Sequence, residues 1–300
     1  MHYVSPFESL GVSNFENIDK SSLNLAKKKL LAEIELSNTH SILRGKREMT
    51  KDDVLKAFDT MTEVENWDFH RLVAKDSILL RFLEDSKMER DEKILQAPEY
   101  QDTDFINFIS PYFSYSYTQL VILCLEKRQP KRLETLMYDN PFLVVETDAE
   151  NIWSEVEHYV NQKIETIEEM ADQVERGVNF TDTEVVGFYA MGTIECLNLL
   201  PKGDFDWVRG RYAIALYNFS ANTWNKKNHY RAVAMVKNAQ LMVLSDYERN
   251  LVDERIAFFD VEMAKLSGNV ATSDSESPWN GRTIFWLVIM VLQVYRHGCN

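Results

Sequence analysis

Apolar residues recur every three or four positions along most of the chain, which is the period of one face of an α-helix. The pattern predicts helices over residues 23–36, 52–61, 149–177, 184–200, 205–224, 229–244 and 246–266. Very short turns separate the last four, so these helices should pack as antiparallel hairpins. The run Phe142-Leu-Val-Val145 is the only convincing β-type run, and it predicts one small strand or an extended buried loop. The predicted fold class is therefore all-α.

The same pattern divides the chain into four parts. A small N-terminal helical module occupies residues 1–90, and its two main helices are separated by a polar stretch, 37–48, that we expect to be flexible. An array of helical hairpins follows over 91–266 and begins in an acidic connector. A polar linker, 267–281, then leads to an apolar tail, 282–300.

Composition and charge narrow the class of protein. The 300 residues include 33 Lys and Arg against 47 Asp and Glu, which gives a net charge of -14. An acidic protein repels a phosphate backbone, so we expect no nucleic acid partner. With 10 Gly and 7 Pro, the chain is poor in residues that break helices. This scarcity argues against a turn-rich β protein or a glycine-dependent nucleotide-binding fold.

Cysteine usage and the N-terminal sequence indicate in which cellular compartment the protein is expected. Cys124 and Cys196 lie in apolar helical runs and should be small buried residues of the core. Their spacing matches no zinc motif, and unpatterned cysteines fit a reducing compartment. Residues 1–15 show neither the basic region nor the apolar run of a secretory signal. The expected location is the cytoplasm, or the cytoplasmic face of a membrane.

The N-terminal module resembles the J domain of the DnaJ co-chaperone family. The opening Phe7-Glu-Ser-Leu-Gly-Val12 is similar to that family's first motif, residues 25–36 to its basic second helix, and 52–61 to its third helix. The family engages its heat-shock chaperone partner through a His-Pro-Asp tripeptide between the last two helices. Here His40 is present, but no Pro-Asp follows it. The resemblance therefore implies a degenerate module that does not stimulate the chaperone; a plain three-helix bundle is the alternative.

A second resemblance lies in residues 205–244, which are similar to a tetratricopeptide repeat. The residues that carry the first-helix pattern are Leu216, Phe219, Ser220 and Thr223. The small, large, small pattern of the second helix falls on Ala232, Val236 and Ala239. Thr223 replaces the family's aromatic residue, Leu244 stands in place of its proline, and no 34-residue period is visible elsewhere. The resemblance implies an array of TPR-like α-hairpins.

The C-terminal tail is the most apolar stretch of the chain. Nine uninterrupted apolar residues form its centre: Ile284, Phe285, Trp286, Leu287, Val288, Ile289, Met290, Val291 and Leu292. Residues 283–295 would span about 20 Å as a helix, against about 30 Å for the hydrocarbon core of a bilayer. A membrane anchor and a helix that docks into a groove of this protein or a partner both fit the tail.

No motif of a catalytic, metal or cofactor site is recognisable in the sequence. There is no phosphate loop, nucleophile elbow, kinase signature or zinc spacing, so we predict no cofactor and no metal. His70 and His229 are the isolated histidines with aromatic neighbours, but a lone helical His is usually structural. The catalytic prediction is therefore none.

The predicted function is that of a non-enzymatic adaptor or scaffold. Stacked helical hairpins expose concave surfaces that suit a protein partner. The predicted partner-binding residues are Tyr212, Tyr217, Trp224 and Tyr230, although core packing explains each of them equally well. The tail would add membrane association. An enzyme with an unrecognised helical fold and a chaperone cofactor are the alternatives.

Overall fold

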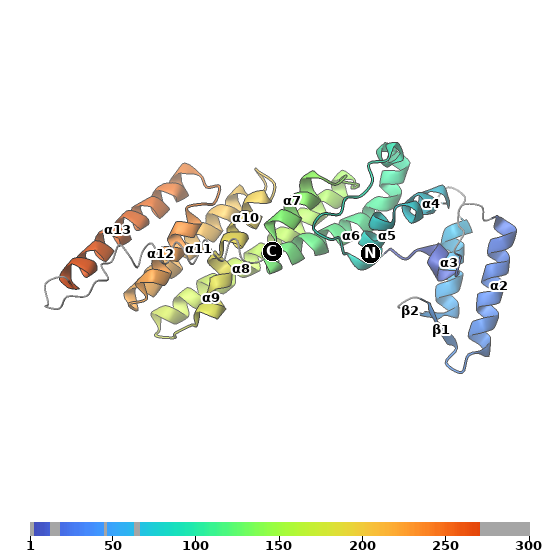
Figure 1. Cartoon of the computed structure of the whole chain (residues 1–300), viewed down its shortest axis with the longest axis horizontal. Coiled ribbons are helices and arrows are strands. Elements are labelled where there is room, and N and C mark those ends of the chain that lie inside the picture. The colour runs from blue at the N-terminus through green and yellow to red at the C-terminus, as the bar shows by residue number, and fades with distance from the viewer. Residues whose placement is uncertain (1–2, 13–18, 45–46, 63–66, 271–300) are drawn as a thin grey trace. The chain divides into compact units, whose positions relative to one another are not determined.

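The computed structural model describes residues 3–12, 19–44, 47–62 and 67–270. It is 75% helix and 2% strand, so the predicted all-α class is confirmed. Figure 1 shows the elements in chain order: α1 (Pro6–Ser9), α2 (Lys20–Leu36), β1 (Ser41–Arg44), β2 (Arg47–Thr50), α3 (Lys51–Thr62), α4 (Trp67–Lys75), α5 (Ser77–Asp85), the 3-10 helix η1 (Pro98–Gln101), α6 (Thr103–Lys127), α7 (Pro130–Tyr138), α8 (Glu146–Glu175), α9 (Asp182–Tyr189), α10 (Met191–Leu199), α11 (Asp206–Asn225), α12 (His229–Ala239) and α13 (Asp246–Val270).

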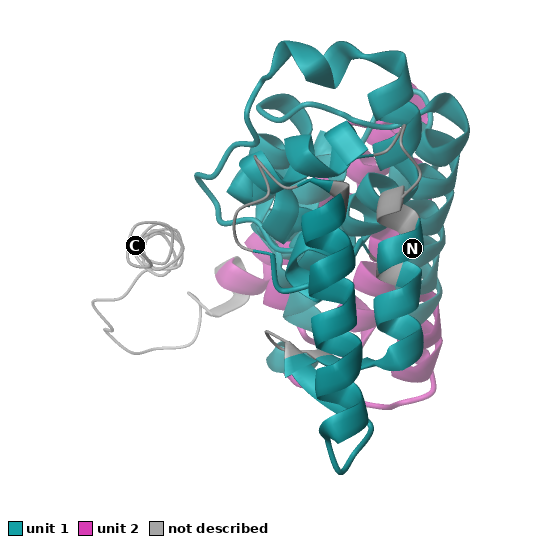
Figure 2. Cartoon of the chain, turned by 90° about the vertical axis from the view of Figure 1, so that its right-hand side faces the viewer, with its two compact units in different colours: residues 1–166, 182–209 teal, residues 167–181, 210–300 magenta. Residues whose placement is uncertain are grey.

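The chain forms two compact units, which Figure 2 distinguishes by colour. Unit 1 consists of residues 1–166 and 182–209, and unit 2 of residues 167–181 and 210–300. The division runs through the long helices α8 and α11. The predicted module boundary near residue 90 lies inside unit 1, so the units are not the two modules expected from the sequence, and that boundary stays a prediction.

The first part of unit 1 packs α1, α2 and α3 around one apolar cluster. Asp19 caps α2 by accepting the Ser22 amide at 2.7 Å, which satisfies a helix-end donor. The cluster contains Phe7, Leu10, Leu23, Leu30, Ile34, Met49, Val54 and Phe58. The prediction that residues 37–48 are flexible is wrong in part, because an antiparallel hairpin, β1–β2, pairs Ile42 with Met49. Met49 is 5% exposed and belongs to the cluster, so burial of its side chain fixes the hairpin.

The β-type run at 142–145 is an extended loop and not a strand. Its Leu143 is 2% exposed, and the Val145 amide donates to Ser110 Oγ on α6 at 3.0 Å. The second of the two predicted alternatives, an extended buried loop, is therefore the one found.

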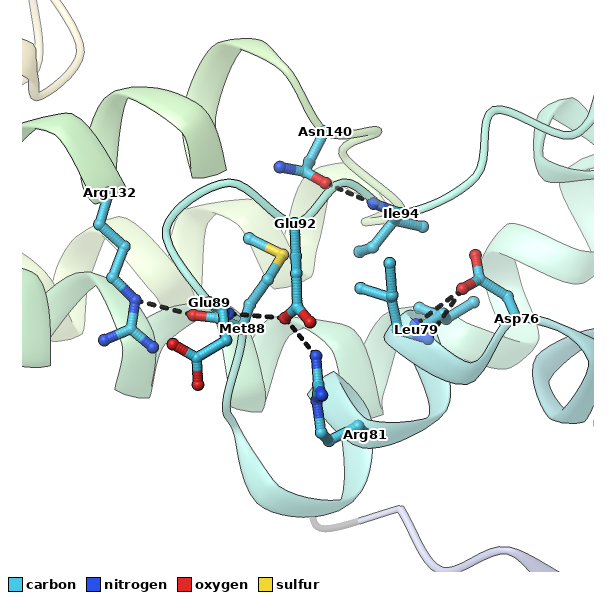
Figure 3. Close-up of polar contacts among 10 residues, drawn as sticks. Asp76, Leu79, Arg81, Met88, Glu89, Glu92, Ile94, Arg132 and Asn140 are labelled. Atoms are coloured by element: carbon cyan, nitrogen blue, oxygen red, sulfur yellow. Dashed lines mark hydrogen bonds and ion pairs between the residues drawn. The ribbon is translucent and has the colours of Figure 1, made fainter.

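The segment 86–97 is tied to its neighbours in unit 1 by its own backbone (Figure 3). The Leu95 amide donates to Asp76 Oδ2 at 2.9 Å, and the Ile94 amide donates to Asn140 Oδ1 at 2.8 Å. Arg132 Nε on α7 donates to the Met88 carbonyl at 2.8 Å. Asp76 is 3% exposed and also caps α5. Residues 86–97, which we call the strap, are thus a packed part of unit 1.

The helix predicted over 184–200 is two helices, α9 and α10, separated at Ala190. Two glycines flank the break, and both lie against Arg128, the left-handed residue that ends α6 (φ 56°). A Cβ at Gly187 would lie 2.8 Å from Arg128 Nη2, and one at Gly192 would lie 2.9 Å from the Arg128 backbone oxygen. At Gly192 only glycine admits so close an approach to a backbone oxygen, whereas at Gly187 the near atom belongs to a flexible side chain.

The core of unit 2 lies between α12 and α13. Its buried residues are Ala232, Val236 and Phe259, and the Trp224 ring stacks on Phe259 with centroids 4.3 Å apart. Ala232 and Ala239 are fully buried, as the small-residue pattern of the sequence predicts. Small side chains there let α12 approach its neighbour closely.

Candidate functional site

The four predicted partner-binding residues occupy four different environments in unit 2. Tyr212 is 2% exposed and belongs to the core, so its ring offers no surface to a partner. Trp224 is half-buried between Phe259 and the His229 ring, whose centroid lies 4.2 Å away. Both rings therefore stabilise the fold, the alternative that the sequence left open.

Tyr217 and Tyr230 are the more accessible members of the predicted set. Tyr217 is half-buried, and the Arg255 guanidinium lies 4.2 Å from its ring centroid, a cation–π contact. Tyr230, on α12, is 68% exposed. Of the four residues, Tyr230 alone presents a large apolar surface to solvent.

Helix α13 carries an exposed apolar face that the sequence analysis missed. Tyr247, Phe258 and Val261 are 69%, 49% and 55% exposed. Phe258 and Val261 follow Tyr247 by 11 and 14 residues, which is about three and four helical turns, so all three share one face. Buried Val252 and Phe259 lie on the other side of the helix. We call Tyr247, Phe258 and Val261 the outer stripe. The signal that could have revealed it in the sequence is that these three apolar residues fall outside the helix face formed by Val252 and Phe259.

Unit 2 also contains a cavity of about 310 Å³ at the start of α12. Its polar lining comes from the end of α11, the turn after it and the first turn of α12: Thr223, Lys226, Lys227, Asn228 and Arg231. Its apolar lining comes from α8 and the segment that follows α8: Val174, Val178 and Phe180. Asn179 completes the lining, which contains no Asp or Glu among the described residues. We call this site the basic cavity.

Two matching helix ends build the walls of the basic cavity. After α8, the Val178 amide donates to the Gln173 carbonyl and the Gly177 amide to the Val174 carbonyl. After α11, the Asn228 amide donates to the Thr223 carbonyl and the Lys227 amide donates to the Trp224 carbonyl. Both are Schellman ends, in which the residue after the helix is left-handed. Gly177 adopts this conformation freely (φ 100°), whereas Lys227 (φ 65°) adopts it at a cost of about 1–2 kcal/mol.

One buried side chain in the lining of the basic cavity lacks a hydrogen-bond partner within the described residues. Thr223 is 3% exposed, yet its hydroxyl forms no hydrogen bond. Asn228 is the N-cap of α12, but its side chain caps no amide there, and no acidic residue occupies the first turn.

The two histidines singled out in the sequence are packed against aromatic rings. His70, in unit 1, is 2% exposed; a 2.9 Å hydrogen bond joins its Nδ1 to Tyr3 Oη, and the Phe108 ring lies edge-on at 4.9 Å. Burial lowers the pKa of His70 to about 4. In unit 2, His229 packs on Trp224, and its buried Nδ1 has no partner among the described residues.

Cys124 and Cys196 are both fully buried in unit 1, which confirms the sequence prediction. The Cys196 thiol donates to the Cys124 carbonyl at 3.6 Å. Burial raises the pKa of Cys124 to about 11 and that of Cys196 to about 12. Because only a thiolate is a strong nucleophile, neither sulfur is activated at neutral pH.

Across residues 3–12, 19–44, 47–62 and 67–270, no three His, Cys, Asp or Glu side chains are grouped so that they could hold a metal ion. None of the helices in that part of the chain is both long and apolar enough to cross a bilayer. The predicted apolar tail, 282–300, lies outside the described residues.

Comparison of the chain with protein-family models, with curated proteins and with solved structures found no match in any of the three. The resemblances to a J domain and to a tetratricopeptide repeat therefore stay predictions from the sequence.

Proposed function

We propose that the protein is a non-enzymatic adaptor that binds a protein partner through the outer surface of the α12–α13 hairpin. One observation carries the proposal, which is the exposure of the outer stripe on a helix whose other side packs in the core of unit 2. Exposed apolar side chains that share one helix face are typical of interaction surfaces, and aromatic residues are enriched in such surfaces.

The size of this surface bears on how a partner would engage it. Helix α13 has 25 residues, so its outer face is roughly 37 Å long and about 10 Å wide. That face covers roughly half of the ~800 Å² that each partner buries in a stable interface. A partner would therefore also contact the α12–α13 turn, where Leu241 and Val243 are 49% and 41% exposed.

The test compares two doubly substituted full-length proteins in affinity purification with quantitative mass spectrometry. The first, Tyr247→Asp with Val261→Asp, places two charges on the outer stripe. The second, Arg249→Gln with Ser267→Asp, changes the net charge by the same two units at exposed positions on another face of the helix and serves as the control. Partners retained by the wild type and the control should be lost from the stripe variant. If the wild type, the stripe variant and the control all retain the same set of proteins, the outer stripe is not the binding surface.

The proposal includes association with a membrane surface through the apolar tail. Its support is in the sequence, where nine uninterrupted apolar residues, 284–292, follow a polar linker. One short apolar segment gives weak, reversible membrane binding, and a second contact strengthens it. A partner bound to unit 2 and a tail at the membrane would thus cooperate through effective concentration.

A further inference from the structure

The outer stripe lies on the helix that directly precedes the polar linker and the apolar tail. Its three side chains are between 49% and 69% exposed within the part of the chain that the structure describes. Helix α13 ends at Val270, and the chain continues through residues 271–283 to the nine apolar residues 284–292, which we call the apolar run. Stripe and apolar run are both assigned to unit 2. An exposed apolar face and an apolar segment thus follow each other closely along the chain.

The connection between them is long enough for the apolar run to return along α13. Residues 271–283 number 13 and are mostly polar. An extended chain of that length reaches about 43 Å. The 25 residues of α13 make a helix about 37 Å long. The apolar run can therefore reach any part of the outer stripe.

The length of the tail also favours a protein surface as its docking site. As a helix, residues 283–295 would be about 20 Å long, against about 30 Å for the hydrocarbon core of a bilayer. A helix that packs on another helix has no such minimum length, and each apolar side chain that leaves water contributes. The pair α12–α13 shows that unit 2 already packs two consecutive helices in this way.

Charge complementarity points to α13 in particular. Residues 282–300 contain two Arg and no Lys, Asp or Glu. Helix α13 contains six Asp and Glu against three Lys and Arg. A cationic segment is attracted to an acidic helix, and the tether keeps the two at high effective concentration.

One antiparallel register satisfies the charges and the apolar surfaces together. Glu254 is exposed and lies one helical turn before Phe258, on the face of the outer stripe. Placing Arg296 beside Glu254 sets the apolar run opposite residues 258–266, because both helices rise by the same distance per residue. In this register the apolar run covers the Phe258 end of the outer stripe.

We propose that the apolar tail folds back on α13 and covers the Phe258 end of the outer stripe, where it competes with the protein partner. The competition rests on the proposed function, which makes the outer stripe the partner site. The apolar run cannot lie on α13 and in a membrane at once. Binding of the tail to a membrane would therefore uncover the outer stripe for the partner.

Hydrogen exchange of the α13 amides, measured by mass spectrometry without lipid or detergent, tests the contact. A version ending at Gly281 keeps α13 and lacks the tail. Its α13 amides should exchange about tenfold faster than those of the full-length protein, since packing against the tail opposes local opening. Ile289→Asp, within the apolar run, should exchange as the shortened version does. Asn300→Asp adds the same charge outside the run and should behave as the wild type; equal exchange in all four proteins would overturn the contact.

Charge reversal tests the register. Arg296→Glu and Glu254→Arg should each speed exchange around Phe258, and the double variant should restore the slower rate, because opposite charges then face each other again. A double variant that exchanges as fast as the single ones would overturn the register. The slow exchange should also persist when the protein is diluted. Protection that disappears on dilution would overturn the intramolecular contact and assign it to a second copy of the chain.

Partner capture separates this inference from the proposed function. The version ending at Gly281 should retain more of the stripe-dependent partners than the full-length protein does. Equal capture by the two, with slow exchange in the full-length protein, would overturn the competition. Equal exchange overturns the tail contact even where the stripe variant loses its partners. Slow exchange with identical capture by the wild type and the stripe variant overturns the partner site and leaves the tail contact in place.

Discussion

His70 shows how one buried side chain makes the stability of unit 1 depend on pH. Burial lowers the pKa of His70 to about 4 from its ordinary 6.5. The unfolded chain therefore takes up a proton below pH 6.5, whereas the folded chain stays neutral at this residue until about pH 4. Stability from His70 is complete above pH 6.5 and is lost as the pH falls toward 4.

Between pH 7 and pH 5 we expect His70 to account for a loss of about 2 kcal/mol in the free energy of unfolding. Urea denaturation at both pH values measures this loss. The His70→Asn variant places an amide near the position of Nδ1, so it can keep the Tyr3 contact while removing the titration. Its stability should change less over the same pH range. An equal change in both proteins would show that His70 does not titrate as described.

Single residues also mark where sequence reasoning about the site succeeded and failed. The burial of Ala232 agrees with the small-residue pattern of the sequence, whereas the exposure of Tyr230 is one of two alternatives that the sequence left open. The sequence could not show that Tyr212 is buried and Tyr230 exposed, because an aromatic residue on a helical hairpin can face either the core or the solvent. The burial of Tyr212 depends on which helices cover α11, and that information is not local in the sequence.

At the scale of elements, the contact between Arg128 and two glycines gives a matched pair of substitutions. Gly192→Ala would place a methyl group 2.9 Å from a backbone oxygen, which cannot move without shifting the end of α6. The methyl group of Gly187→Ala would lie 2.8 Å from the end of the Arg128 side chain, which is flexible and exposed. The guanidinium can swing away, and alanine favours the helix by about 1 kcal/mol over glycine.

We therefore expect Gly192→Ala to destabilise the protein by about 1–3 kcal/mol and Gly187→Ala to change its stability by less than about 1 kcal/mol. Chemical denaturation of the two variants beside the wild type measures both values. A larger loss for Gly187→Ala than for Gly192→Ala would contradict this account of the break between α9 and α10.

Helices could be predicted from this sequence more closely than their connections. The expected range 205–224 matches α11 (Asp206–Asn225), because the apolar period and the following turn are both local signals. The strap could not be foreseen, since Leu95 binds Asp76 and Ile94 binds Asn140 across 19 and 46 residues. The acidic composition of the longer stretch 85–104 suggested a solvated connector, whereas the backbone amides of the strap determine its place in the fold.

At the scale of the whole molecule, the apolar tail contrasts with an acidic body. The net charge of -14 repels anionic membranes, so any attraction must come from apolar burial of residues 284–292. We expect the full-length protein to float with neutral phosphatidylcholine vesicles in a density gradient, and a version ending at Leu266 to stay at the bottom. Ile289→Asp, which interrupts the apolar run, should behave as the shortened version does. If all three proteins sediment alike, the tail does not bind a membrane.

The left-handed Lys227 introduces backbone strain at the end of α11. Lysine is strained in this conformation and glycine is not, so Lys227→Gly should raise the free energy of unfolding by about 1 kcal/mol. Thermal unfolding of the variant beside the wild type measures this gain. Selection of this chain for heat resistance alone would therefore favour glycine at this position.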